Sequence, residues 1–100
     1  MVYERLVGLN VTNDALYEQY RASMAPILKR YGGSFRYDFR IAEVLKNESG
    51  APINRVFIID FPDKVSKESF FGDSEYLEVR NKFFTPAVGA STTLAEYERD

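Results

Sequence analysis

The sequence predicts an α+β fold in which strands and helices follow the order β-α-β-β-α-β. Two amphipathic helical segments each separate strand-like segments, and two of the strands follow one another across a turn rich in helix and strand breakers. Short strands joined by two crossover helices are typical of an antiparallel sheet covered on one face. The 100 residues are about the size of one domain, so we expect residues 1–100 to form a single domain.

The first strand and the first helix are predicted from simple periodicities. Residues 2–11 place every second side chain on one mainly apolar face, which is the pattern of a half-buried strand. Thr12 or Asn13 is the expected N-cap of a helix over residues 15–31, whose apolar side chains recur at steps of three and four. Pro26 lacks an amide hydrogen, so we expect the helix to kink or restart there before the glycine pair that ends it.

The rest of the chain supplies three further strands and a second helical region. We expect strands over residues 34–46 and 53–61, separated by the turn sequence NESGAP. The second helical region is expected over residues 66–84, capped by its first serine and broken near residues 72–74. Alternating small and apolar residues predict a last strand over residues 87–97.

This order is that of a ferredoxin-like sandwich, with the second strand at a sheet edge and the first and third strands central. Two helices cover only one face of such a sheet, yet the third strand is apolar on both sides, with Phe57 and Ile59 opposed to Val56 and Ile58. A large exposed apolar face normally marks an interface. We therefore expect a homodimer that packs sheet against sheet through the open face, around a shared barrel-like core.

Composition and charge exclude several classes of function. The net charge of −2 and the absence of a basic run argue against nucleic-acid binding. The chain has no cysteine and no histidine, so thiolate and imidazole metal sites, disulfides and a histidine base are excluded, and we expect no metal and no cofactor. No apolar run approaches the roughly 18 residues of a membrane span, and the charged start is unlike a signal peptide, so we expect a cytoplasmic protein.

Charged residues alternate along the predicted second strand and form the main candidate site. Arg36, Asp38 and Arg40 share one parity, so we expect them on one face, where two guanidinium groups flank a carboxylate. Such a group can hold an anionic substrate, with Asp38 as the catalytic acid or base. The alternative is that these charges only protect a sheet edge from aggregation. Tyr76 and Arg80, one helical turn apart, either join the binding pocket or simply pack together.

Tyrosines supply a second set of candidate polar groups. Tyr17, Tyr20 and Tyr31 lie on the first helix, and Tyr37 lies on the second strand among the candidate substrate-binding residues. Their hydroxyl groups can line a cleft between helix and sheet. The alternative is that the rings belong to the core and the hydroxyl groups reach the surface.

Three stretches together resemble the DUF1330 family, a group of small proteins of unknown function in the dimeric α/β-barrel superfamily. They are YEQYRASMAPILKRYGG in the first helix, VFIIDFPD in the third strand and SFFGDSEYLEVR in the second helical region. The resemblance covers most of residues 5–97. It implies a ferredoxin-like fold and a dimer. The wider superfamily includes cofactor-free monooxygenases, haem-dependent enzymes and isomerases, and the absence of histidine argues against the usual haem members.

Three functions fit these observations. The first is a dimer that binds a small, largely apolar organic molecule in a cleft between helices and sheet, with cofactor-free catalysis. The second is a binding or sensing dimer without chemistry, and the third is a structural interaction module. A pocket lined by tyrosine and arginine would favour the first two over the third.

Overall fold

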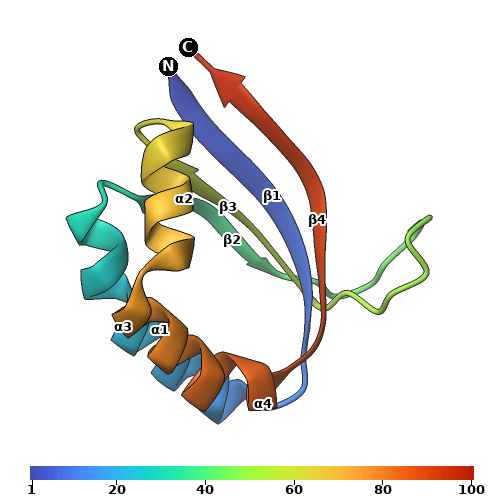
Figure 1. Ribbon diagram of the computed structural model, residues 1–100. Coiled ribbons are helices and arrows are strands. Elements are labelled where there is room, and N and C mark those ends of the chain that lie inside the picture. Colours follow the sequence, from blue (N-terminus) through green and yellow to red (C-terminus); the bar gives the residue numbers. More distant parts are fainter.

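The computed structural model describes residues 1–100 and has two layers, a sheet and a set of helices that cover one of its faces (Figure 1). The four-stranded sheet has the order β2-β3-β1-β4, and every neighbouring pair is antiparallel. The strands are β1 (Val2–Val11), β2 (Ser34–Arg40), β3 (Arg55–Phe61) and β4 (Val88–Arg99). The predicted ferredoxin-like arrangement is confirmed, with β2 at an edge and β1 and β3 in the centre.

Helix α1 (Asp14–Arg30) begins at Asn13, whose side chain accepts a hydrogen bond from the Leu16 amide. The helix continues through Pro26, so the predicted restart does not occur. Pro26 is exposed, so the position that lacks an amide hydrogen lies on the solvent side of the helix and not on its buried face. The helix ends where Gly32 adopts a φ of +74°, a conformation that favours glycine.

The second helical region is divided into short pieces, as the sequence predicts for the stretch near Gly72. Asp63, not Ser66, caps the first piece: its carboxylate accepts a hydrogen bond from the Ser66 amide. Asp73 caps the next piece in the same way. The pieces are α2 (Lys64–Gly72), α3 (Ser74–Val79), the π-helical turn η1 (Arg80–Phe84) and α4 (Thr85–Ala87). None of the helices combines the length and the apolar character needed to span a membrane.

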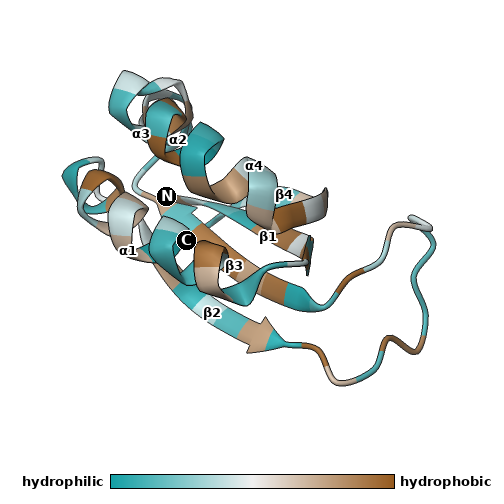
Figure 2. Ribbon diagram, turned by 90° about the horizontal axis from the view of Figure 1, so that it is seen from below, coloured by the Kyte–Doolittle hydropathy of each residue, from teal (hydrophilic) through white to brown (hydrophobic).

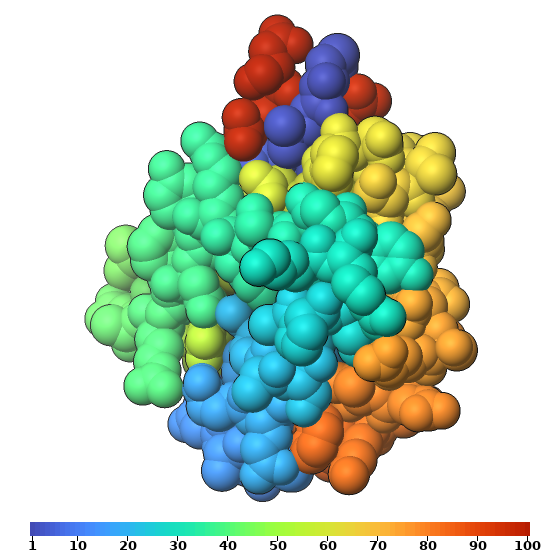
Figure 3. Space-filling view, turned by 90° about the vertical axis from the view of Figure 1, so that its left-hand side faces the viewer, coloured from blue at the N-terminus to red at the C-terminus, as the bar shows by residue number.

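The core lies between the helices and the sheet. Figure 3 shows the helical face, where α1 crosses the middle, β2 lies along one side and the segment from α2 to α4 lies along the other. Phe70 has no exposed surface and contacts the rings of Phe61, Phe71 and Tyr76. The buried core residues are Val7, Leu9, Val11, Tyr17, Tyr20, Met24, Ile27, Leu28, Phe57, Ile59, Phe61, Phe70, Tyr76 and Ala87.

Strand β2 is shorter than predicted, because residues 41–54 leave the sheet as a long loop, here called the arm. The Ile41 amide donates the last hydrogen bond to the Asn54 carbonyl, and the chain then diverges from β3. Figures 1 and 2 show the arm extending away from the body of the molecule, on the side opposite to the helices. Its tip is exposed, and Leu45 keeps 88% of its surface accessible. Residues 42–46 have no strand partner, so their apolar pattern does not make a strand.

A β-bulge at Arg36 reverses the parity of β2. Phe35 pairs with Ile59, whereas Tyr37 pairs with the adjacent Ile58, so Arg36 is an extra residue in the ladder. Phe35 therefore packs toward the helices and against Phe57, with ring centroids 5.2 Å apart. Tyr37 and Phe39 turn to the opposite face, where their rings stack.

That opposite face, here called the open face, carries many apolar side chains and no helix. Phe39 is 53% exposed, Tyr37 is 46% exposed and Leu94 is 44% exposed. The apolar side chains of this face, here called the open-face patch, are Leu6, Tyr37, Phe39, Ile53, Val56, Ile58, Leu94 and Tyr97. The arm overhangs part of the patch and forms with it a groove of about 480 Å³.

One end of the open face carries a buried carboxylate. Glu4 has no exposed surface and is covered by Arg99, whose Nε lies 2.9 Å from Oε2, and by Arg36, whose Nη1 lies 3.5 Å from Oε1. Burial raises the pKa of the Glu4 carboxyl group, but Arg99, the Tyr97 hydroxyl group and the charge of Arg36 together outweigh burial, so the pKa is lowered. Glu4 therefore stays charged at neutral pH.

Candidate ligand site between helices and sheet

A cavity of about 280 Å³ lies between the helices and the sheet. Its walls come from all four strands on one side and from α1, α2, α3 and η1 on the other. Twelve of its fifteen lining residues are hydrophobic. The lining residues are Arg5, Val7, Leu9, Tyr17, Tyr20, Met24, Phe35, Phe57, Ile59, Phe71, Tyr76, Leu77, Arg80, Phe84 and Ser91.

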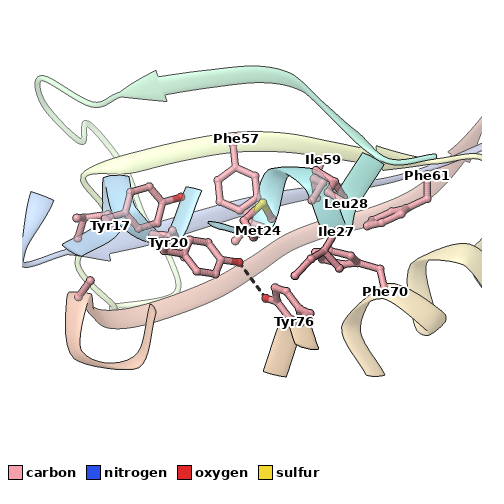
Figure 4. Close-up of a cluster of buried hydrophobic side chains, with 14 residues drawn as sticks. Tyr17, Tyr20, Met24, Ile27, Leu28, Phe57, Ile59, Phe61, Phe70 and Tyr76 are labelled. Atoms are coloured by element: carbon pink, nitrogen blue, oxygen red, sulfur yellow. Dashed lines mark hydrogen bonds between the residues drawn. The ribbon is translucent and has the colours of Figure 1, made fainter. Parts of the chain in front are cut away.

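Two tyrosines place their hydroxyl groups together in this cavity. Tyr20 comes from α1 and Tyr76 from α3, and their hydroxyl oxygens are 2.9 Å apart (Figure 4). Both residues are buried, and burial raises the pKa of each phenol above its usual value. Both phenols are therefore neutral at physiological pH and keep their protons.

Two arginines lie at the same cavity with different surroundings. Arg5 lies over the ring of Phe71, and its Nε is 2.8 Å from a carboxylate oxygen of Glu96. Arg80 lies over the ring of Phe84 and has no carboxylate within ion-pair distance. The charge of Arg5 is thus neutralised within the protein, whereas that of Arg80 remains free.

A charged network flanks the cavity behind Tyr17. Arg55 donates two hydrogen bonds to Asp38, from Nε to Oδ1 and from Nη2 to Oδ2, both at 2.9 Å. Arg21 Nη1 lies 3.1 Å from Asp38 Oδ2, and Arg21 Nε donates to the Tyr17 hydroxyl at 2.8 Å. Asp38 therefore fixes the position of Arg21, which in turn orients a hydroxyl group on the cavity wall.

The Asp38 carboxyl group is held in its charged form. Burial raises its pKa, but the hydrogen bonds from Arg55 and the charge of Arg21 outweigh burial, and the net result is a lowered pKa. Since both oxygens already accept hydrogen bonds from guanidinium groups, the carboxylate is a positioning group in this arrangement.

The structure does not bring the predicted site residues into one place. Tyr76 and Arg80 line the cavity, as one of the two sequence interpretations has it. The expectation that Arg36, Asp38 and Arg40 share a face is wrong, because the bulge at Arg36 leaves that residue on the open face beside Glu4.

The other predicted site residues of β2 also lie outside the cavity. Asp38 faces the helices but contacts Arg55 and Arg21 instead of the cavity. Tyr37 belongs to the open-face patch. Arg40 is exposed at the end of β2, opposite Arg55, and forms no ion pair. For these residues a role in substrate binding stays a prediction that the geometry of the cavity does not favour.

Sequence reasoning missed Arg5 and Arg55 as part of the site. Each is a charged residue on the face of a central strand that otherwise points into the core. Arg5 shares that face of β1 with Tyr3 and Val7, and Arg55 shares that face of β3 with Phe57 and Ile59. A charge at such a position is costly unless it is paired. The presence of arginine on otherwise apolar strand faces could therefore have indicated a polar site beneath the helices.

The layered α+β architecture is that of a ferredoxin-like protein, and solved structures with this fold superpose on the chain. A protein of unknown function from Rhodopseudomonas palustris matches with a TM-score of 0.83 at 18% identity, over 98% of this chain and 82% of that one. A dabb family protein with a ferredoxin-like fold from Mesorhizobium loti matches with a TM-score of 0.69 at 12% identity, over 98% and 96%. A dimeric protein of unknown function with a ferredoxin-like fold from Bacteroides fragilis gives 0.61 at 11% identity, over 98% and 96%.

The chain belongs to the DUF1330 family, whose model, described as a domain of unknown function, matches residues 5–94. The resemblance noted in the sequence is thereby confirmed. No protein among the curated ones matches the chain. No group of three or more carboxylates lies together in a way that would hold a metal ion.

Proposed function

We propose that this protein is a homodimer that binds a compact, mainly apolar organic molecule in the cavity between helices and sheet. The observation that carries the proposal is the cavity itself, about 280 Å³ in volume and lined mostly by hydrophobic side chains with a few polar groups. Small-molecule sites typically have this composition. The volume equals roughly nine water molecules, which suits a ligand the size of a substituted aromatic ring.

Tyr76 and Arg80 are the residues that we assign to ligand binding. Arg80 has an unpaired charge and stacks on Phe84, so it can hold a polar or anionic group at the edge of the cavity. Asp38 acts indirectly, through Arg21 and the hydroxyl group of Tyr17.

The proposal is tested by a thermal-shift screen of small aromatic compounds, because binding to the native state raises the apparent stability. Ser91 is exposed on β4 and lines the cavity, so Ser91→Phe should fill it and abolish the shifts. Ser69→Phe, on the exposed side of α2, is the matched control and should keep them. A screen without hits, or shifts that survive Ser91→Phe, would contradict the proposal.

Asp38→Asn distinguishes an enzyme from a binding protein once a ligand is known. The substitution keeps the size of the side chain and removes the charge that holds Arg21. Loss of turnover with unchanged folding supports cofactor-free catalysis, and loss of affinity alone supports a binding or sensing protein. The structural interaction module predicts no ligand at all.

The dimer is proposed from the open-face patch. Exposure of apolar surface forfeits about 25 cal/mol per Å², and a second copy that covers the patch recovers this free energy. A two-fold axis would let the arm of each copy cover part of the open-face patch of the other. The neighbour from Bacteroides fragilis is described as dimeric, which supports a dimer but does not specify its interface. Tyr37, which lies in the patch, is assigned to this contact.

Analytical ultracentrifugation at micromolar concentration tests the dimer. Phe39→Glu places a charge in the open-face patch and should yield monomers. Val65→Glu is the matched control, since Val65 is 70% exposed on α2, on the helical side of the molecule. A wild-type protein that sediments as a monomer would contradict the dimer.

A further inference from the structure

The hydrogen bond between Tyr20 and Tyr76 leaves one proton without a partner. Their hydroxyl oxygens lie 2.9 Å apart, and neither hydroxyl group has another hydrogen-bond partner in the protein. A pair of phenols carries two O–H protons, and one hydrogen bond between them uses only one. Whichever tyrosine donates to the other, the second O–H group remains unpaired beside the cavity.

An unpaired donor at this position is unusual, because buried polar groups nearly always find a partner. Tyr20 is 5% exposed and Tyr76 is 2% exposed, and both line the cavity. Aromatic rings pack against both tyrosines: the ring of Phe84 lies 4.9 Å from that of Tyr20, and the ring of Phe71 lies 5.6 Å from that of Tyr76, centroid to centroid. The free proton is therefore available to a molecule in the cavity.

The lining also restricts the charge of that molecule. Arg5 and Arg80 border the cavity, and no carboxylate is among its lining residues. A cationic ligand would be repelled by the unpaired guanidinium group of Arg80, and a ligand with donor groups alone would leave the tyrosine O–H group unpaired. The ligand class that fits this lining is a neutral or anionic molecule that presents an acceptor oxygen.

We propose that the Tyr20–Tyr76 pair is the polar anchor of the site and that its unpaired O–H group donates a hydrogen bond to a carbonyl oxygen on an otherwise apolar aromatic ligand. This inference rests on the proposed ligand-binding function and specifies the class of ligand. The two hydroxyl groups come from α1 and α3, so the anchor exists only where these helices meet over the sheet. Tyr20 thereby becomes a binding residue alongside Tyr76.

The experiment compares two probes of the same shape, acetophenone and α-methylstyrene, in which a methylene group replaces the carbonyl oxygen. Their dissociation constants are measured by chemical-shift titration with the wild-type protein, the two single Tyr→Phe variants and the double variant Tyr20→Phe/Tyr76→Phe. The ratio of the two constants for each protein reports the contribution of the hydrogen bond. Circular dichroism verifies that each variant is folded, and the double variant leaves no unpaired hydroxyl group.

We expect the ratio to favour acetophenone about fivefold more in the wild type than in the double variant, the effect of one net hydrogen bond. At least one single variant should keep the preference, because removal of one hydroxyl group frees the proton of the other. A ratio that is the same in the wild type and the double variant overturns the anchor while leaving the proposed function intact. Failure of both probes to bind the wild type overturns the anchor and counts against the proposed function as well.

Discussion

Removal of the Asp38 carboxylate tests the network that supports the cavity. In Asp38→Ala, the Arg55 guanidinium loses two hydrogen bonds of 2.9 Å, and its nearest remaining carboxylate is that of Glu18, at 3.8 Å. The Arg55 side chain is only 11% exposed, so water cannot fully replace the lost partner, whereas that of Asp38 is 29% exposed. The pair is thus intermediate between a surface ion pair, worth up to about 1 kcal/mol, and a buried pair, whose disruption costs about 3–5 kcal/mol.

We expect Asp38→Ala to lower the free energy of unfolding by about 2 kcal/mol, and Asp38→Asn, which keeps an acceptor oxygen, by about 1 kcal/mol. The assay is urea denaturation at one fixed protein concentration, since a dimer makes stability concentration-dependent. Glu43→Ala is the control, because Glu43 is an exposed carboxylate of the arm without an ion pair. If Asp38→Ala costs no more than Glu43→Ala, the network does not stabilise the fold and the reasoning fails.

The same variants predict a pH dependence. The pKa of Asp38 is lower in the folded protein than in the unfolded chain. Its contribution to the free energy of unfolding is therefore fully present above its pKa in the unfolded chain, about 4. This stabilisation is lost as the pH falls through the lowered pKa of Asp38 in the folded protein. The difference in stability between the wild type and Asp38→Asn should therefore shrink at about pH 3 relative to pH 7. A difference that stays constant or grows on acidification would refute the assignment.

Three further predictions concern the core, the end of α1 and the tyrosine pair. Phe70→Ala, at a residue with no exposed surface, should cost about 3–5 kcal/mol in urea denaturation, and a cost below about 1 kcal/mol would contradict its place in the core. Gly32→Ala should lower the free energy of unfolding more than Gly50→Ala, although both glycines have positive φ, because a Cβ at Gly32 would lie 2.7 Å from a Pro62 ring atom whereas one at Gly50 meets nothing. Equal losses of stability would exclude that clash. Burial raises the pKa of Tyr20 and Tyr76, so stability should fall above about pH 10, where the unfolded chain releases these protons first, and this alkaline loss should be smaller in the double Phe variant.

The sequence predicted the fold because the signals involved are local. Helix α1 was readable from the three- and four-residue spacing of Tyr20, Met24 and Ile27, and its end from the glycine pair. The order of the elements then restricted the topology, since short strands with two crossover helices allow few arrangements. The predicted second strand was too long, because its end depends on where β3 stops offering a partner, and residues 42–46 have none.

The candidate site was predicted only in part. Tyr76 and Arg80 were found because they lie one turn apart on a helix, and that geometry is fixed by the chain itself. Arg36 and Asp38 were placed together because alternation implies a shared face, and the bulge breaks the alternation. The bulge exists only in relation to the residues of β3, so no inspection of β2 alone reveals it.

The amino-acid sequence by itself determined the helices, the strand order, the family and the excess of apolar surface on the sheet, since each depends on residue type and spacing along the chain. Tertiary structure alone decided which polar groups meet. Tyr20 pairs with Tyr76 and Asp38 pairs with Arg55, although the partners are well separated in sequence. Their distances are set by how the helices pack on the sheet and by the β-bulge that shifts the register between β2 and β3.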